Sequence, residues 1–343
     1  MTAPLSKAVL PEDGEFLPHH HFWTAAAFAE ERERVFGRCW LYMGVFDRGA
    51  LDATDALSAE MAGLRFEVRR RGEVLEGVCR DGERVRPLEV DRCGALVFAR
   101  VARDSGPTPA PTSAPTSAPT LTEHLHPYAE RLAAMSVNCV NPEPSVGIPF
   151  QANWKALVEN TMDDFHGSTV HPQTIHPAVH PDWQTHLTTE RFGANSDSRW
   201  LLADGTAGWW RKLDAKLRLA KFAEEAFYRH IFIFPNFYLA SFLGAVVIPH
   251  RVDPLAPDAS VLRWQLFLPT TRLETPREQA FHRSTAAYLV ASAAGVINED
   301  RPVCEAVQQG RPAILGNGAY GRRERRILDF HAAMLAQLAG AAA

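Results

Sequence analysis

The first hundred residues alternate apolar and polar positions after one short helical stretch. Thr24 is a good N-cap, and the apolar residues between it and Cys39 fall near one helical face. From Leu64 to Val68 every second residue is apolar and the others are charged, which is typical of a half-buried strand. Further strand-like runs extend to Val101. This pattern predicts a helix followed by a small, mostly β unit.

The C-terminal two thirds mix helical and strand patterns. Residues 154–165 repeat apolar side chains at helical spacing, whereas residues 228–247 and 261–268 are aromatic and β-branched, as in strands. A capping box with proline at the first helical position predicts a long helix from Thr275 to about Asn298. A terminal amphipathic helix is predicted over 322–338. Helices packed over one face of a sheet indicate an α+β domain.

Between the two regions lies the segment Gly106 to Thr120, which consists almost entirely of Pro, Thr, Ser and Ala. This composition has no apolar surface to bury, and its prolines keep it extended. We therefore expect an N-terminal unit over 1–105, a linker over 106–122 and a larger domain over 123–343.

Composition narrows the class of protein. The formal net charge is −4, with no basic cluster long enough to indicate nucleic-acid binding. The five cysteines are scattered, which argues against a disulfide framework and favours a reducing cytoplasm. The start shows no apolar secretion signal, and the longest apolar run is too short for a membrane span. We expect a cytoplasmic protein.

The segment from Asn153 to His171 carries the candidate chemistry. If the predicted helix continues, Glu159, Asp163 and His166 lie at i, i+4 and i+7 and share one face. Gly167 and Ser168 then let the chain turn, so that His171 points to the same place. Two imidazoles and one carboxylate form the facial triad of non-heme iron(II) enzymes, which leaves coordination positions open for oxygen and substrate.

The carboxylate must come from elsewhere in the chain. Asp300 is the best candidate and Glu299 is its rival, although Asp300 could instead cap a helix that begins after it. The pair His171 and His176 repeats the spacing of the first histidine pair, but prolines follow both of its members, and we expect His176 to be a loop residue.

Several motifs occur together and in a fixed order. They are NWKxxxEN from Asn153, DxFH ending at His166 and HP at His171, with the further segments 21–40, 233–236 and 299–310. In this combination the chain resembles the catalytic domain of Rieske non-heme iron ring-hydroxylating oxygenases.

The resemblance implies a helix-grip, START-like catalytic domain in which His166, His171 and Asp300 bind Fe(II). It also implies that Asp163 is the carboxylate that links the iron to a neighbouring subunit's Rieske cluster. We group Asn160 with Asp163 as a candidate catalytic residue. Asn160 and Glu159 could orient a histidine, or they could simply decorate the helix.

The chain departs from the family where a Rieske cluster would be bound. Such a cluster needs two cysteines and two histidines in CxH and CxxH pairs. No histidine occurs between Leu41 and Val101, and Cys79 and Cys93 are isolated. We therefore expect a shortened, mostly β remnant of a Rieske-type domain, with no iron–sulfur cluster in this chain.

The leading hypothesis is an iron(II)-dependent oxygenase that hydroxylates or oxidatively cleaves a small organic substrate, as in aromatic compound metabolism. Dioxygen would be its second substrate. Electrons would come from an electron-donor protein, a reductase or a Rieske-containing sister subunit of an oligomer, such as a mixed trimer. The alternatives are a non-catalytic or regulatory companion subunit of a full-length Rieske oxygenase, and a helix-grip ligand-binding or lyase protein.

Overall fold

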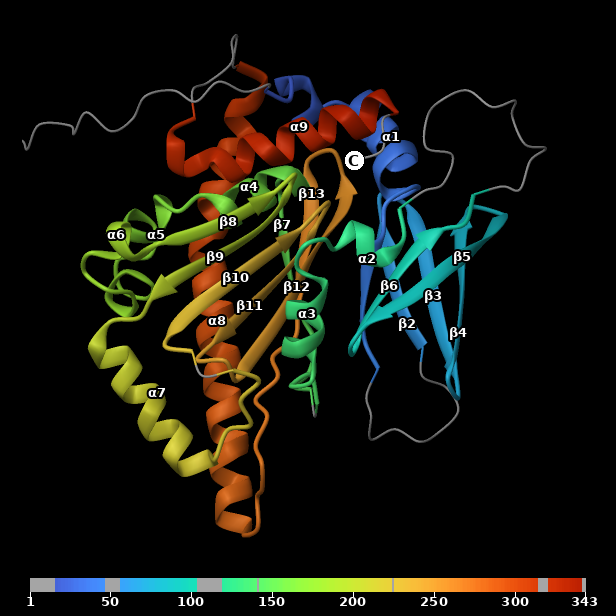
Figure 1. The fold of residues 1–343 in the computed structure, drawn as a ribbon. Helices are drawn as coiled ribbons and strands as arrows, with labels where there is room; N and C mark the ends of the chain where they lie inside the picture. The colour runs from blue at the N-terminus through green and yellow to red at the C-terminus, as the bar shows by residue number, and fades with distance from the viewer. Residues whose placement is uncertain are drawn as a thin grey trace, which may run out of the picture.

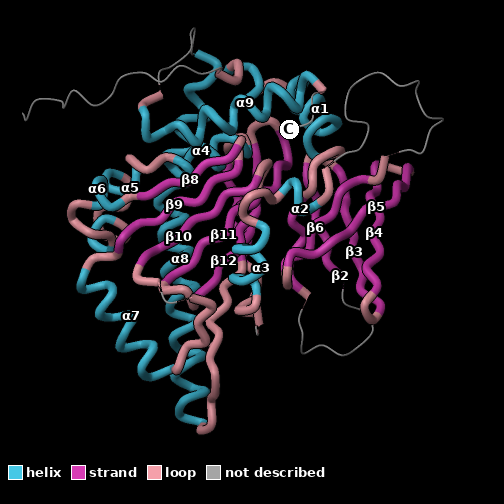
Figure 2. The backbone as a smooth tube through the Cα atoms, viewed as in Figure 1, coloured by secondary structure: helices cyan, strands magenta, loops and turns pink. Residues whose placement is uncertain are grey.

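The computed structural model describes residues 16–46, 56–103, 119–140, 142–223, 225–313 and 320–340. It contains two antiparallel sheets, one formed by residues before the predicted linker and one by residues after it (Figures 1 and 2). Residues 106–118 of that linker lie outside the described residues. Thr120 caps α2 (Leu121–His124), so the last residues of the predicted linker are part of the folded structure.

The N-terminal sheet has six strands in the order β1-β6-β5-β4-β3-β2. Their bounds are β1 Leu41–Val45, β2 Ala56–Met61, β3 Leu64–Arg71, β4 Val74–Asp81, β5 Arg84–Cys93 and β6 Leu96–Val101. The connections from β2 to β6 are tight turns, which occupy only residues 62–63, 72–73, 82–83 and 94–95. The alternating pattern therefore correctly predicted a small β unit.

Gly94 shows how tightly this sheet approaches its neighbour α3 (Ala129–Ser136). Its φ is +62°, and a Cβ at this position would lie 1.9 Å from Ser136 Oγ. Only glycine combines this backbone conformation with so close an approach. Across the same contact, Ala95 N donates to Ser136 Oγ at 2.9 Å.

The C-terminal sheet has seven strands in the order β7-β13-β12-β11-β10-β9-β8. Their bounds are β7 Val146–Phe150, β8 Thr188–Phe192, β9 Asn195–Leu201, β10 Phe227–Ile233, β11 Phe237–Phe242, β12 Val246–Ala256 and β13 Ala259–Trp264. The helices around it are α4 Trp154–Met162, α5 His166–Thr169, α6 Trp183–His186, α7 Asp204–Leu217, α8 Pro276–Gly310 and α9 Arg325–Ala339.

Each face of this sheet has its own apolar core. Phe232, Leu262 and other side chains of one face pack with residues of α4, α8 and α9. Ile231, Leu239 and others on the opposite face pack with α2, α3 and residues of β1 and β6. The seven-stranded sheet is therefore a middle layer, with α8 behind it and the N-terminal sheet beside it in Figure 1.

The N-terminal helix α1 (Ala25–Glu31) packs on the larger domain. Thr24 caps it as predicted, and its last residue, Glu31, is fully buried. Glu31 accepts hydrogen bonds from Trp154 Nε1 at 2.8 Å and from Lys155 Nζ at 2.6 Å. The buried charge of Glu31 is tolerated because the Lys155 ammonium balances it and both carboxylate oxygens accept hydrogen bonds. Among the described residues, no helix is long and apolar enough to cross a membrane.

Candidate metal centre

The helix that leads to His166 ends earlier than predicted. α4 begins at the N-cap Asn153 and stops at Met162, and Asp163 is extended, with φ −77° and ψ 114°. Asp163 Oδ1 accepts a hydrogen bond from Phe165 N at 2.7 Å, and this local bond competes with continuation of the helix. The prediction that Glu159, Asp163 and His166 share one helical face is therefore wrong. His166 instead begins the short helix α5.

The carboxylate of the candidate centre comes from the C-terminal third of α8. This helix runs without interruption from Pro276 to Gly310, although Pro302 lies inside it. A proline removes one helical hydrogen bond, and here the helix continues past that loss. The alternative prediction, that Asp300 caps a new helix, is wrong because Asp300 lies well within α8.

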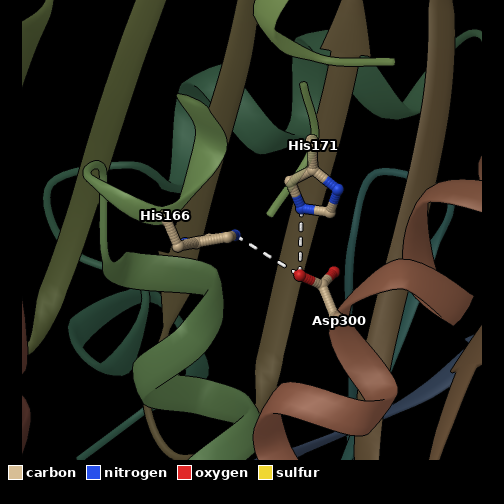
Figure 3. A group of neighbouring side chains, drawn as sticks. All are labelled: His166, His171 and Asp300. Atoms are coloured by element: carbon tan, nitrogen blue, oxygen red, sulfur yellow. Dashed lines mark ion pairs between the residues drawn. The ribbon is translucent and has the colours of Figure 1, made fainter. Parts of the chain in front are cut away.

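The structure brings together the three residues that the sequence singled out. One ligand atom from each of His166, His171 and Asp300 lies within 4.8 Å of the others (Figure 3). Asp300 Oδ1 is 3.4 Å from His166 Nε2 and 2.9 Å from His171 Nε2. Two imidazole nitrogens thus face one carboxylate oxygen across a small gap.

Two of these atoms are buried without a hydrogen-bond partner. Among the described residues, neither His171 Nε2 nor Asp300 Oδ1 makes a hydrogen bond of acceptable geometry. Buried polar atoms rarely remain unsatisfied, and those that do are often the ligands of an ion. A set of two imidazoles and one carboxylate suits a divalent transition metal such as iron. The residues present therefore fit a mononuclear iron site.

His171 is held from its far side. Its side chain is fully buried, and its Nδ1 lies 2.7 Å from Glu299 Oε2, which also accepts a hydrogen bond from Thr174 Oγ1 at 2.7 Å. A carboxylate on the second nitrogen fixes the tautomer and orientation of a metal-binding histidine. Glu299, the rival for the ligand role, is engaged in this bond instead. No local pattern around Thr174 indicates that it bonds to Glu299.

The carboxylates around His166 and His171 favour a positive charge between these side chains. Burial disfavours a charged imidazole, but Asp163 and Asp300 outweigh it and raise the pKa of His166 to about 9. Burial likewise disfavours the Asp300 carboxylate, yet the two histidines lower its pKa to about 2. A cation between these groups would supply the charge that the protons otherwise bring.

The two predicted catalytic residues differ in placement. Asp163 Oδ2 lies 3.7 Å from His166 Nδ1, so Asp163 borders the group. Asn160 is half-buried on α4, and within the described residues its side chain makes no hydrogen bond. A role for Asn160 stays a prediction. His176 lies in a separate single turn, His176–Ala178, outside the group.

Glu159 belongs to a clamp between α4 and the end of α8. Arg311 Nη2 donates to Glu159 Oε2 at 2.6 Å, and His331 Nε2 lies 2.8 Å from Glu159 Oε1. Leu17 N donates to His331 Nδ1, so His331 Nε2 is the nitrogen that donates to Glu159. Glu159 therefore orients no histidine of the candidate centre.

Two further bonds connect α8 to the residues just before α4. Gln151 N donates to Glu305 Oε1, and Asn153 N donates to Gln308 Oε1, each at 3.0 Å. Both acceptors lie on α8, within three turns of the helix after Asp300. The clamp thus fixes the segment that bears the acid to the helix that leads to His166. These partners lie about 150 positions apart in the chain, beyond the reach of any local pattern.

One family of known proteins matches most of the chain. The model of the family described as ring hydroxylating alpha subunit (catalytic domain) matches residues 122–340. No curated protein sequence matches.

Solved structures resemble the whole chain in fold. A quaternary ammonium Rieske monooxygenase, described for carnitine oxidation by gut microbiota and inter-subunit electron transfer, is 14% identical. Its TM-score is 0.67, with 94% of this chain and 95% of that chain covered. Naphthalene 1,2-dioxygenase from Rhodococcus sp., bound to indole, is also 14% identical. Its TM-score is 0.64, with 94% of each chain covered. Because the identities are low, these likenesses show the fold alone: mixed α+β, with a β-rich N-terminal sheet and a catalytic-type domain that contains a long helix.

Proposed function

This chain belongs to the ring-hydroxylating alpha-subunit family, and from that premise we propose that it is an iron(II)-dependent oxygenase of small organic substrates. The observation that carries the proposal is the convergence of His166, His171 and Asp300. A metal held by this facial triad retains open positions on the side away from the protein ligands. The proposal includes the finer assignment of the fold as a helix-grip domain preceded by a remnant of a Rieske domain, with the domain limits expected from the sequence.

Iron(II) at this site would activate dioxygen for hydroxylation or oxidative cleavage of a substrate bond. The residues of the chain prepare the site for it. His166 and His171 supply neutral nitrogen donors, and Asp300 supplies the anionic oxygen. Glu299 keeps the His171 proton on Nδ1, which leaves Nε2 free to bind the metal. The clamp between α4 and α8 keeps the two ligand-bearing segments in register.

We further propose that electrons reach the site from outside this chain. Residues 41–101 contain no histidine, and each of the four described turns from β2 to β6 is only two residues long, too short to carry a CxH or CxxH pair. Asp163, beside His166 and with 28% of its side chain exposed, is the candidate contact for an electron-donor protein or a Rieske-containing sister subunit.

The same missing cluster ligands favour a second candidate, a non-catalytic companion subunit that assembles with a full-length oxygenase. The two candidates differ in whether the centre turns over. Reduced, iron-loaded protein that consumes dioxygen with a competent electron donor supports the oxygenase. A chain that binds iron but never consumes dioxygen, alone or with such a donor, supports the companion subunit.

The substitution Asp300→Asn tests the metal assignment. It nearly preserves shape but removes the only anionic donor, so anaerobically purified protein should contain far less iron than wild type. The substitution also removes the pairing of Asp300 with His166 and His171, so iron content is compared on Asp300→Asn protein that circular dichroism shows to be folded. Full iron loading in Asp300→Asn would contradict the proposed ligand set and make Glu299 the next residue to test.

A further inference from the structure

A polar residue lies on the face of the seven-stranded sheet that packs toward the candidate centre. His230, in β10, is 5% exposed. It shares this face with Phe232, two residues further along the strand, and with Tyr238, which pairs with Phe232 across to β11. Both aromatic residues belong to the core that contains Leu157 of α4 and Ile297 of α8. His230 therefore points into the layer that also holds the candidate centre.

The neighbours of His230 sense the charge of that centre. The ring of Tyr238 lies 4.8 Å from the ring of His230. Burial raises the pKa of Tyr238, and the charges of Tyr228 and Asp300 raise it further. Tyr228, two residues before His230 on the same strand face, also has its pKa raised by burial and, to a smaller extent, by Asp300. The Asp300 carboxylate thus acts over the patch of sheet that carries His230.

The tautomer of His230 follows from its partner. Arg326 Nη2 lies 2.8 Å from His230 Nδ1. A guanidinium has only donors, so Nδ1 accepts and the imidazole proton is on Nε2. Burial, followed by the charges of Arg326 and His250, lowers the pKa of His230 well below 6.5, which keeps the ring neutral. The guanidinium also polarises the ring, which strengthens Nε2–H as a donor.

That Nε2–H group has no partner. It is buried and makes no hydrogen bond to any residue in the described part of the chain. A histidine that served only to hold Arg326 would usually engage its second nitrogen as well, because an unsatisfied buried donor is costly. Arg326 has another partner in Ser196 Oγ, at 2.9 Å. The orientation of His230 therefore leaves a strong donor available to something else.

A second donor lies nearby on the same face. Trp200, in β9, pairs with Tyr228 in β10, and its buried Nε1–H likewise has no partner among the described residues. A Cβ placed on Gly167 would be 3.4 Å from the Trp200 ring. Trp200 therefore borders the turn between His166 and His171.

We propose that His230, assisted by Trp200, binds an oxygen acceptor of the substrate, so that the substrate is a carbonyl- or carboxylate-bearing organic molecule and not a plain hydrocarbon. The inference rests on the proposed function, because it names the substrate class of the same site. Two buried donors select by hydrogen bonding: an analogue that lacks the acceptor leaves both unsatisfied, and a site built this way rejects it strongly.

The test uses two probes of the same shape, acetophenone and α-methylstyrene, in which a carbonyl oxygen replaces a methylene group. Binding is measured by calorimetry on the metal-free full-length protein, so that the metal cannot contribute to the preference. Wild type should prefer acetophenone by about tenfold or more. His230→Leu should remove most of that preference, and His230→Gln, which keeps an N–H donor, should retain part of it.

Ser241→Ala is the matched control. Ser241 Oγ is also buried without a partner among the described residues, but it lies on the opposite face of the sheet, since Tyr238 and Ser241 are an odd number of residues apart in β11. Its removal should leave the preference unchanged. In ¹⁵N-histidine spectra of wild type, acetophenone should shift the Nε2 signal of His230, a readout that remains available if a variant fails to fold.

Equal affinity for the two probes, no binding of either, an unchanged preference in folded His230→Leu, or an unmoved His230 signal would each overturn the inference. The first two results would mean that water satisfies the donors. Iron content, measured separately, distinguishes this failure from that of the proposed function. A wild-type chain that prefers acetophenone but takes up no iron would disprove the oxygenase and leave the donor site standing.

Discussion

Glu299 offers the sharpest test of how the centre is held. It accepts from the fully buried His171 at 2.7 Å. Glu299→Gln keeps an oxygen acceptor and loses the charge, whereas Glu299→Leu loses both and leaves a buried N–H unsatisfied. Removal of such a partner typically weakens metal affinity about 10- to 100-fold, or roughly 1.4–2.7 kcal/mol. We expect Gln near the lower limit and Leu near the upper one.

The assay is anaerobic competition for iron(II) against a coloured chelator. Asn298→Leu is the matched control, because Asn298 is exposed on the same helix and, among the described residues, its side chain bonds only to the main-chain Ala294 O, at 2.8 Å. Its iron affinity should stay within a few fold of wild type. Wild-type affinity in Glu299→Leu, or equal losses in the two leucine variants, would refute the argument. A larger loss in Glu299→Gln than in Asp300→Asn would exchange the roles of the two acids.

Two other expectations concern the histidine register and the helix clamp. His166→Ala should abolish iron binding while His176→Ala leaves most of it, as measured by metal content; the reverse result would mean that the register is wrong. Arg311→Met breaks a buried pair and should lower the unfolding free energy by about 3 kcal/mol in denaturant titrations, whereas Arg218→Met, at an exposed pair, should cost under about 1 kcal/mol. Burial favours neutral Glu159, but His331 and Arg311 outweigh it and lower the pKa of Glu159. A lowered folded-state pKa stabilises the protein above the unfolded value of about 4.3, so the Arg311 effect should shrink as the pH falls through and below that value.

Local signals in the sequence predicted most of the elements. Thr24 and Thr275 cap helices as expected, and the alternation over 64–68 lies in a strand. The predicted terminal helix is α9. Each of these signals depends on neighbours within a few residues, so one sequence suffices to recognise it.

The errors arose where local and distant interactions compete. The helical pattern continues past Met162, but the Asp163 side chain bonds to the backbone and ends the helix. The predicted helix ended near Asn298, with Asp300 as a possible cap of a new one, yet α8 continues through Pro302 and carries Asp300 in its interior. Glu159 was a candidate to orient a metal histidine. Its actual partner, Arg311, could not be foreseen, because the two residues lie 152 positions apart and spacing gives no information at that distance. The grouping of Asp300 with the histidines depended on the family resemblance.

The amount of iron and of acid-labile sulfide per chain, measured on protein purified without oxygen, tests the central claim most directly. The proposed centre predicts about one iron and no sulfide, because His166, His171 and Asp300 converge while strands β1 to β6 contain no histidine. The iron should disappear in His171→Ala. Sulfide in the pure chain, or wild-type protein that takes up no iron when iron(II) is supplied, would contradict the account.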